Sequence, residues 1–465
     1  MRTLLLGAAL SALALTLLPT RTASAVEVTY DHVHQRTLGN GMTVVVVENH
    51  AVPIVTLEIS AKNGAFTEPP EYNGLSHLYE HMFFKANATY ATQEDYLARV
   101  RELGMIFNGT TSTERVNYYF TLQSHRLEEG MRFMADAIRT PRFETSELER
   151  EREVVLGEYD RNEANPYWYL FDAMNGLLWH TYGTRKDALG DRDTIGTATV
   201  EQMRWMQETY YIPNNMLLVI SGAADPEETF AMAEALYGDW AAGPDPFQAY
   251  PIPEHPPLEG HVAAVVEQPV GASVIQLAWH GPDTRGDLEA TYAADVFSYA
   301  LSQTGSRFQE ALVESGVALG ASLSYSTQRY VGPIFLTLQT LPGGEEAAIR
   351  AALAEVARFA DEDYVTDAQI AAAQTILATD ALYDQQSTEA LAHTLTYWWC
   401  SATIDYFLTY IDELAAVERA DMQEYVRTYL HGQPLATVLL SSGEAIASGE
   451  WTPERLTTLT EEVAP

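Results

Sequence analysis

Residues 73–85 read NGLSHLYEHMFFK, and the segment HLYEH at positions 77–81 is the pattern from which the fold can be identified. His77 and His81 are four positions apart, so a helix places both imidazoles on one face, where they can bind one metal ion. Glu80 projects toward the same side without having to be a ligand. Zinc hydrolases need this arrangement: two neutral nitrogens hold the metal, and a nearby carboxylate deprotonates the bound water.

The order His-x-x-Glu-His is the inverse of the commoner zincin motif and is the inverzincin signature. A chain of this composition would contain it by chance roughly 0.02–0.03 times. Buried or capping histidines could explain His77 or His81 singly, but they explain the pair poorly. The motif therefore predicts a metal site that holds one zinc ion per chain.

The sequence around the motif resembles the pitrilysin/insulinase-type zinc peptidases, which include mitochondrial processing peptidase and two-domain bacterial members. Residues 38–44, LGNGMTV, are similar to the first strand of that family, and residues 84–85, FK, end the metal helix as they do there. Further similar segments lie at residues 103–111, 182–190 and 211–219. The resemblance covers most of the mature chain and is densest in its first half.

A third protein ligand is needed, because two histidines and a water leave tetrahedral zinc one ligand short. The resemblance implies that this ligand is the glutamate 77 positions after the second histidine, which is Glu158. Taken alone, the glutamate-rich segment 151–158 reads as a solvated helix face. Glu151, about two turns before Glu158, matches the carboxylate that supports the catalytic site in the family by orienting a ligand.

The resemblance also places substrate on residues 107–111. Asn108 would hydrogen-bond the peptide backbone near the scissile bond, and the strand that contains Phe107 and Gly109 would pair with the peptide by β-augmentation. Asn108 could equally be an ordinary turn residue before Gly109.

The chain has the sequence features of two similar halves. Strand-like apolar segments open each half, at Met42–Val47 and Ile54–Ser60 and again at Val262–Glu267 and Ser273–Ala278. Long helical patterns follow, and Met203, Tyr210 and Val219 recur 219 positions later as Met422, Tyr429 and Val438. We expect an α+β fold of two homologous domains, each a mostly antiparallel sheet packed with helices.

The expected domain boundaries follow from composition. Residues 1–25 read as a secretory signal: Arg2 precedes an apolar stretch that ends at Pro19, and cleavage is expected after Ala25. The zinc-binding peptidase domain is expected at 26–240, a proline-rich linker at 241–260, and a homologous domain without metal at 261–465. The mature protein should be periplasmic or secreted and should have no integral membrane segment.

Charge and cysteine content exclude several other classes of protein. The 465 residues carry 64 Asp+Glu against 27 Lys+Arg, a net charge of −37, which argues against a nucleic-acid partner. A single cysteine, Cys400, permits neither an intrachain disulfide nor a thiolate zinc site. The acidic residues could line a chamber that favours cationic peptides, or cover the exterior for solubility.

Two residues that the family uses in its second domain are missing. Members that are active as single chains carry an arginine and a tyrosine there, which bind substrate and steady the tetrahedral intermediate. Val313 stands in place of the arginine, and Leu319 or Gly320 in place of the tyrosine. We therefore expect a heterodimer with a zinc-less homologous subunit that supplies the pair, although Tyr325, Arg329 and Tyr330 could substitute from within the chain.

The resulting hypothesis is a zinc metalloendopeptidase that hydrolyses peptides or short unfolded segments, with Glu80 as general base on a zinc-bound water. Two alternatives stay open. One is a non-catalytic peptide-binding or scaffolding protein of the same fold, and the other is a zinc hydrolase of a different kind. Retention of His77, Glu80, His81 and Glu158 argues against a scaffold, because a scaffold does not need an open metal site.

Overall fold

The structure is a computed structural model that describes residues 30–465. The predicted signal segment 1–25 and its cleavage site after Ala25 lie outside these residues. Within the described range, no helix is both long enough and apolar enough to cross a bilayer.

The first sheet has six strands in the order β1-β2-β6-β3-β5-β4. Only β2 and β6 pair in parallel, and the other neighbours are antiparallel. The strands are β1 (Val33–Thr37), β2 (Thr43–Glu48), β3 (Ile54–Ala61), β4 (Ile106–Thr111), β5 (Val116–Gln123) and β6 (Met216–Gly222). The helices of this half are α1 (Leu75–Phe83), α2 (Gln93–Leu103), α3 (Leu127–Arg139), α4 (Thr145–Glu163), α5 (Trp168–Leu178), α6 (Arg192–Thr197), α7 (Val200–Tyr210) and α8 (Pro226–Tyr237).

The second sheet repeats this plan with five strands in the order β7-β11-β8-β10-β9. Its one parallel pair, β7 with β11, corresponds to β2 with β6. The strands are β7 (Val262–Glu267), β8 (Ser273–His280), β9 (Gly320–Tyr325), β10 (Pro333–Thr340) and β11 (Ala436–Ser441). The helices are α10 (Leu288–Ser302), α11 (Arg307–Gln309), α12 (Glu345–Val356), α13 (Asp367–Asp384), α14 (Thr388–Ser401), α15 (Ile404–Ala416), α16 (Arg419–Tyr429), α17 (Gly443–Gly449) and α18 (Pro453–Val463).

The pairing register agrees with the repeat seen in the sequence. Val219 of β6 lies opposite Val45, and Val438 of β11 lies opposite Ala264. Val438 follows Val219 by 219 positions, and Ala264 follows Val45 by the same number. The predicted α+β fold class, with two mostly antiparallel sheets packed with helices, is confirmed. The boundaries at 240 and 260 stay predictions; between them the chain forms one short helix, α9 (Pro246–Ala249), which begins at a proline, as the first turn of a helix allows.

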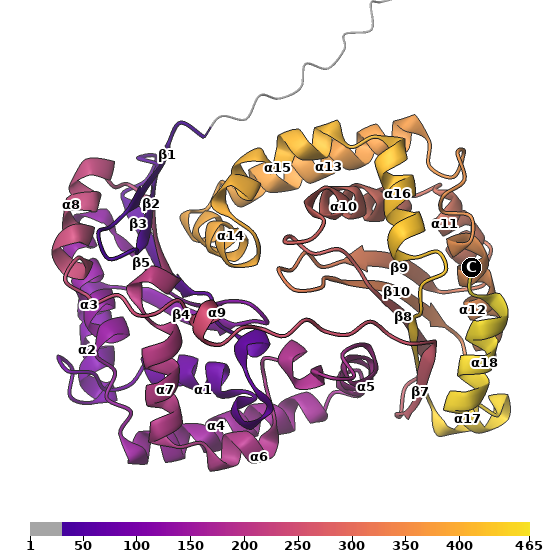
Figure 1. Cartoon of the computed structure of the whole chain (residues 1–465), viewed down its shortest axis with the longest axis horizontal. Helices are drawn as coiled ribbons and strands as arrows, with labels where there is room; N and C mark the ends of the chain where they lie inside the picture. Colours follow the sequence, from indigo (N-terminus) through magenta and orange to yellow (C-terminus); the bar gives the residue numbers. More distant parts are fainter. Residues whose placement is uncertain (1–29) are drawn as a thin grey trace, which may run out of the picture. The chain divides into compact units, whose positions relative to one another are not determined.

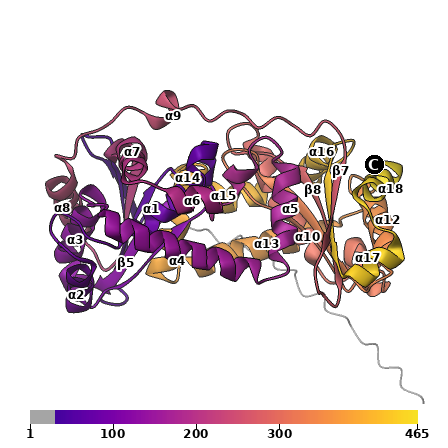
Figure 2. The ribbon, with the colours of Figure 1, turned by 90° about the horizontal axis from the view of Figure 1, so that it is seen from below.

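Each sheet is also covered by a helix from the other half of the sequence. Helix α14 packs on β3 and β6 of the first sheet, whereas α5 packs on β7, β8 and β11 of the second. Figure 1 shows α14, in orange, beside the strands of the first sheet, and Figure 2 shows α5 beside β7 and β8. On the α5 side, Leu170, Met174 and Leu178 join one buried cluster with Val438 and Leu440. This exchange was not predicted, because helical periodicity does not say which sheet a helix will cover.

Candidate metal centre

Helix α1 places the motif, and its first turn is anchored by a buried carboxylate. Glu68, only 2% exposed, accepts hydrogen bonds from the backbone N–H of Gly74 (2.7 Å) and of Ser76 (2.6 Å). Gly74 has φ +91°, and a Cβ there would lie 2.8 Å from the Cα of Gly190, so only glycine fits. Sequence reasoning missed Glu68; its signal would have been a carboxylate shortly before a helix start without a capping side chain.

One face of α1 is buried in the core and the other faces a cavity. Leu75, Leu78 and Met82 belong to the core cluster of the first half. The opposite face presents His77, Glu80 and His81 to a cavity of about 390 Å³. Helical spacing therefore separates the packing residues from the chemical ones, as the motif predicts.

Helix α4 brings Glu158 to the two histidines. Its Oε2 lies 3.6 Å from Nε2 of His77 and 3.9 Å from Nε2 of His81. One ligand atom from each of the three residues fits within 4.8 Å of the others. Two donors bound to zinc at about 2.0–2.2 Å lie roughly 3.3–3.6 Å apart in a tetrahedron, so the set fits a zinc ion after a small contraction.

The pKa values of the two histidines are shifted in opposite directions. Burial, and after it the neighbouring His81, lowers the pKa of His77 to about 4, so this imidazole is neutral, as a metal ligand must be. Burial also opposes charge on His81, but the hydrogen bond with Glu151 and the nearby carboxylates of Glu80 and Glu158 outweigh it and raise its pKa. A metal ion that binds here would therefore displace a proton from His81.

Glu151 supports this arrangement from behind. Its Oε2 lies 3.2 Å from Nδ1 of His81, and its Oε1 pairs with the ammonium of Lys85 at 2.6 Å. Burial alone would raise the pKa of Glu151, but the bonds to His81 and Lys85 lower it below its usual range, so the group stays ionised. The role of Lys85 was not foreseen, although it follows the motif by only four residues.

Glu80 lies at the side of the cavity that faces strand β4. Burial raises its pKa to about 7, against the opposing effects of His81 and of a hydrogen bond from Thr111 Oγ1 to its Oε2 (3.2 Å). A carboxyl group with this pKa can both accept and return a proton near neutral pH. Gly109 lies against it, and a Cβ at this position would come within 2.9 Å of Glu80 Oε1.

The predicted substrate residues lie beside the same cavity. The cavity is lined by Phe107, Asn108 and Gly109. The two histidines, Glu151 and Glu158 line it as well. Phe107, Asn108 and Gly109 belong to β4, which is the last strand in the order of its sheet. An edge strand offers free backbone groups with which an extended peptide can pair.

The second half does not bring the missing pair to this cavity. Val313 packs against the core of the second sheet, Leu319 is exposed, and Gly320 begins β9. The possible substitutes point elsewhere: Tyr325 Oη donates to the carbonyl of Pro282, the side chain of Arg329 lines a different cavity, and the ring of Tyr330 packs against Phe66. None of these residues lines the cavity that holds the motif.

Comparison with known proteins agrees with this fold and shows the family. A family model described as "Insulinase (Peptidase family M16)" matches residues 43–190, and one described as "Peptidase M16 inactive domain" matches residues 197–377. Together the two models match most of the described chain. The chain belongs to the M16 (insulinase) family of peptidases.

Two curated relatives match over less than half of this chain. This chain is 27% identical to an uncharacterized zinc protease of Rickettsia felis over 206 residues. The matched residues make up 44% of this chain and 50% of that protein. This chain is 24% identical over 192 residues to the mitochondrial-processing peptidase subunit beta of Dictyostelium discoideum, 41% of each chain. The matched part thus spans half or less of the length of these relatives.

Solved structures match over nearly the whole chain. A protease from Helicobacter pylori gives a TM-score of 0.79 with 19% identity, over 88% of this chain and 99% of that one. The first half of the periplasmic protease PqqL from Escherichia coli gives 0.73 with 18% identity, over 93% and 97%. At this identity the likeness establishes the fold alone.

Proposed function

We propose that the protein is a zinc metalloendopeptidase that hydrolyses peptides or short unfolded segments. The observation that carries the proposal is the convergence of His77, His81 and Glu158 within 4.8 Å, with Glu80 beside them. A structural or scaffolding role requires neither an open group of ligands nor a carboxylate whose pKa is raised to about 7. The relatives that are named zinc proteases support the same assignment.

Zinc held by these three residues would supply a Lewis acid for the attacking water and the peptide carbonyl. Glu80 would take the proton from the attacking water and later give it to the leaving amine. Strand β4 holds the peptide in an extended conformation by backbone pairing, and Asn108 binds its backbone near the bond that is cut. Glu151 holds the ring of His81 in place with Lys85 behind it.

The proposal includes a partner subunit and a compartment. Val313 and Leu319 or Gly320 offer neither charge nor hydroxyl where an oxyanion develops, so a zinc-less homologous subunit would supply the arginine and tyrosine. One relative, the mitochondrial-processing peptidase subunit beta, is named as one subunit of a larger assembly, which supports paired chains. The signal-like residues 1–25 and the periplasmic PqqL protease as structural neighbour support a periplasmic or secreted protein.

The deciding experiment compares Glu80→Gln with Glu149→Gln, a matched change at an exposed glutamate of α4. Each chain is loaded with zinc and assayed on fluorogenic peptides, alone and together with a zinc-less homologue encoded nearby. We expect Glu80→Gln to keep zinc and lose at least 100-fold in turnover, while Glu149→Gln stays unchanged. Turnover that survives in Glu80→Gln would exclude this residue as the base.

The same assay separates the alternatives. If the wild-type chain cuts peptides equally well alone and in the mixture, the heterodimer is wrong. If zinc binds and no combination shows chelator-sensitive cleavage, the scaffolding alternative is right and the peptidase proposal fails.

A further inference from the structure

A second cavity, of about 500 Å³, shares no lining residue with the metal site. Lys62, just after β3, forms one wall, the residues that lead into α10 and out of β9 form another, and the start of α15 closes it. This volume suits a small ligand of several heavy atoms rather than a single ion.

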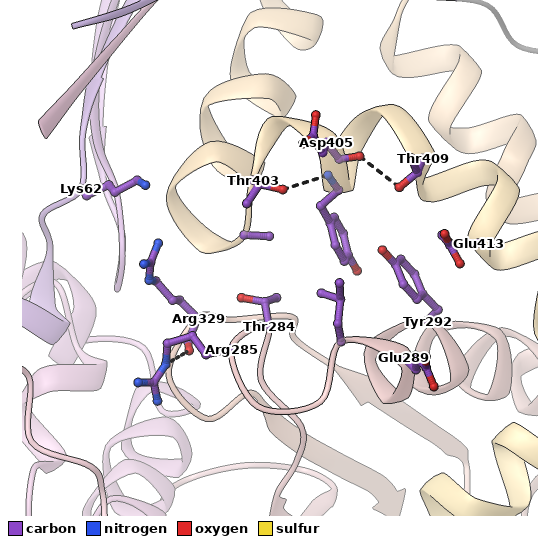
Figure 3. Close-up of a pocket in the computed structure, with 13 residues that line it drawn as sticks. Lys62, Thr284, Arg285, Glu289, Tyr292, Arg329, Thr403, Asp405, Thr409 and Glu413 are labelled. Carbon is purple, nitrogen blue, oxygen red and sulfur yellow. Dashed lines mark hydrogen bonds between the residues drawn. The ribbon is translucent and has the colours of Figure 1, made fainter. Parts of the chain in front are cut away.

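The walls of this cavity are charged in opposite senses at its two ends. Figure 3 shows Lys62, Arg285 and Arg329 on one side and Glu289 and Glu413 on the other. Between them lie the side chains of Tyr292 and Tyr406, whose rings stack at 4.9 Å. A third acidic residue, Asp405, lines the cavity between the two ends. A ligand that fills the space would meet mainly cations at one end, aromatic surface between, and Glu289 and Glu413 at the other.

Two of the three cations form no ion pair in the described part of the chain, although Asp245 acts on Lys62 from a longer distance. Arg285 is held by Glu254 at 2.9 Å and stacks on Tyr330. Among residues 30–465, by contrast, neither Lys62 nor Arg329 forms an ion pair within 4.0 Å, and Nε of Arg329 is buried without a hydrogen-bond partner. Lys62 instead lies 4.3 Å from the ring centre of Trp399.

This lack of a partner is unusual in so acidic a chain. With 64 acidic against 27 basic residues, carboxylates are abundant, and yet none is placed within pairing distance of these two side chains in the described range. Burial, followed by the charge of Arg329, lowers the pKa of Lys62 to about 8, so the two cations sit together at an energetic cost. A bound anion would offset that cost.

We propose that this cavity binds a short peptide by its two free ends, with the carboxylate at Lys62 and Arg329 and the ammonium at Glu289 and Glu413. The residues between the ends would lie on the rings of Tyr292 and Tyr406. A free phosphate or other inorganic anion would satisfy the cations, but it would leave the aromatic surface and the acidic end unused. The choice of a peptide rests on the proposed peptidase function, whereas the binding of the two ends does not require that the protein cuts anything.

The test measures binding by calorimetry to the full chain that carries Glu80→Gln, so that no peptide is consumed. Four trialanine probes are compared: free at both ends, acetylated at the amine, amidated at the carboxylate, and blocked at both. We expect amidation to weaken binding at least tenfold and acetylation to weaken it less, because the acidic residues are more exposed than the cations. Inorganic phosphate should bind at least tenfold more weakly than free trialanine.

Variants locate the binding. Lys62→Met and Arg329→Met should each remove the preference for a free carboxylate, whereas Arg101→Met, at an exposed arginine of α2, should not change it. Glu413→Gln, on an exposed turn of α15, should remove only the preference for a free amine, which keeps the test valid if a cation variant unfolds. Equal affinity for free and amidated peptides, phosphate that binds as tightly as peptide, or binding untouched by all three cavity variants would overturn the proposal. None of these outcomes bears on whether the wild-type chain cleaves peptides.

Discussion

Glu151 Oε2 lies 3.2 Å from Nδ1 of His81, on the side of the imidazole ring opposite the nitrogen that faces Glu158. The carboxylate thereby fixes which nitrogen of His81 is free to bind a metal. Lys85 keeps this carboxylate ionised and in place.

The first prediction follows from that contact. Glu151→Gln should lower zinc affinity about 10–100-fold, because the neutral amide loses the charge that orients His81 and pairs with Lys85. Competition against a chelator of known affinity measures the change. Glu149→Gln, two residues away and exposed, should leave the affinity unaltered; equal losses in the two variants would mean that the helix, rather than the contact, was disturbed.

The second prediction concerns the close approach of β4 to the proposed base. In Gly109→Ala, the new methyl would lie 2.9 Å from Oε1 of Glu80 and 3.2 Å from the carbonyl oxygen of Asn117. The backbone oxygen cannot yield easily, so Glu80 must move. We expect kcat to fall by about tenfold or more while zinc affinity is retained.

Gly176→Ala is the control for that variant. This glycine lies in helix α5, and a Cβ there meets nothing within 4 Å, so activity should persist and the helix should gain up to about 1 kcal/mol in stability. If both variants lose activity equally, the contact between Gly109 and Glu80 has no special role.

Local spacing allowed part of the site to be predicted. Two histidines four apart, with a glutamate between them, specify one face of one helix, and the structure has that helix at Leu75–Phe83. Glu158 could not be found in this way, because it lies on a different helix and its neighbours are mostly charged. Only the resemblance to a family singled it out from the other glutamates of α4.

Other parts of the structure depend on contacts between distant residues. The strands Ile54–Ser60 and Ser273–Ala278 were expected almost as observed, because alternation and β-branched content are local properties. The exchange of α5 and α14 between the two sheets, and the anchoring of α1 by Glu68, were not expected. Each depends on which surfaces meet after the chain has folded, and a single sequence does not record such contacts.

The third prediction concerns the contact between α14 and the first sheet. Glu58 is fully buried on β3, where it accepts hydrogen bonds from Asn117 (2.7 Å) and Thr396 (2.5 Å) and pairs with His393 of α14. Arg115 lies 3.8 Å away. Glu58→Ala should destabilise the protein by about 3 kcal/mol or more, because it removes the acceptor of buried donors and the counter-charge of Arg115.

Thermal or urea unfolding followed by circular dichroism measures that loss. Glu94→Ala, at an exposed position of α2, should change stability by no more than about 0.5 kcal/mol. If Glu58→Ala is equally mild, the buried cluster does not hold α14 on the sheet.

The last prediction is a pH dependence that originates at Glu68. Burial raises the pKa of this carboxyl to about 7, even though the N–H groups of Gly74 and Ser76 favour its ionised form. In the unfolded chain the group titrates near its usual value of about 4.3. Between these two values the folded state holds more protons than the unfolded state, so the stability that Glu68 contributes is complete below about pH 4 and is lost as the pH rises toward 7.

Glu68→Gln should remove this dependence, because the amide does not titrate. Urea unfolding at pH 5 and at pH 8 measures the free energy of unfolding of both proteins. Between pH 5 and pH 8 the free energy of unfolding of the variant should rise relative to that of the wild type, by at most about 3 kcal/mol. At pH 5 the variant should be the less stable of the two, since one amide group cannot accept from both Gly74 and Ser76. A constant difference between the two proteins across this range would show that Glu68 ionises at its ordinary pKa, and that its two backbone hydrogen bonds offset its burial.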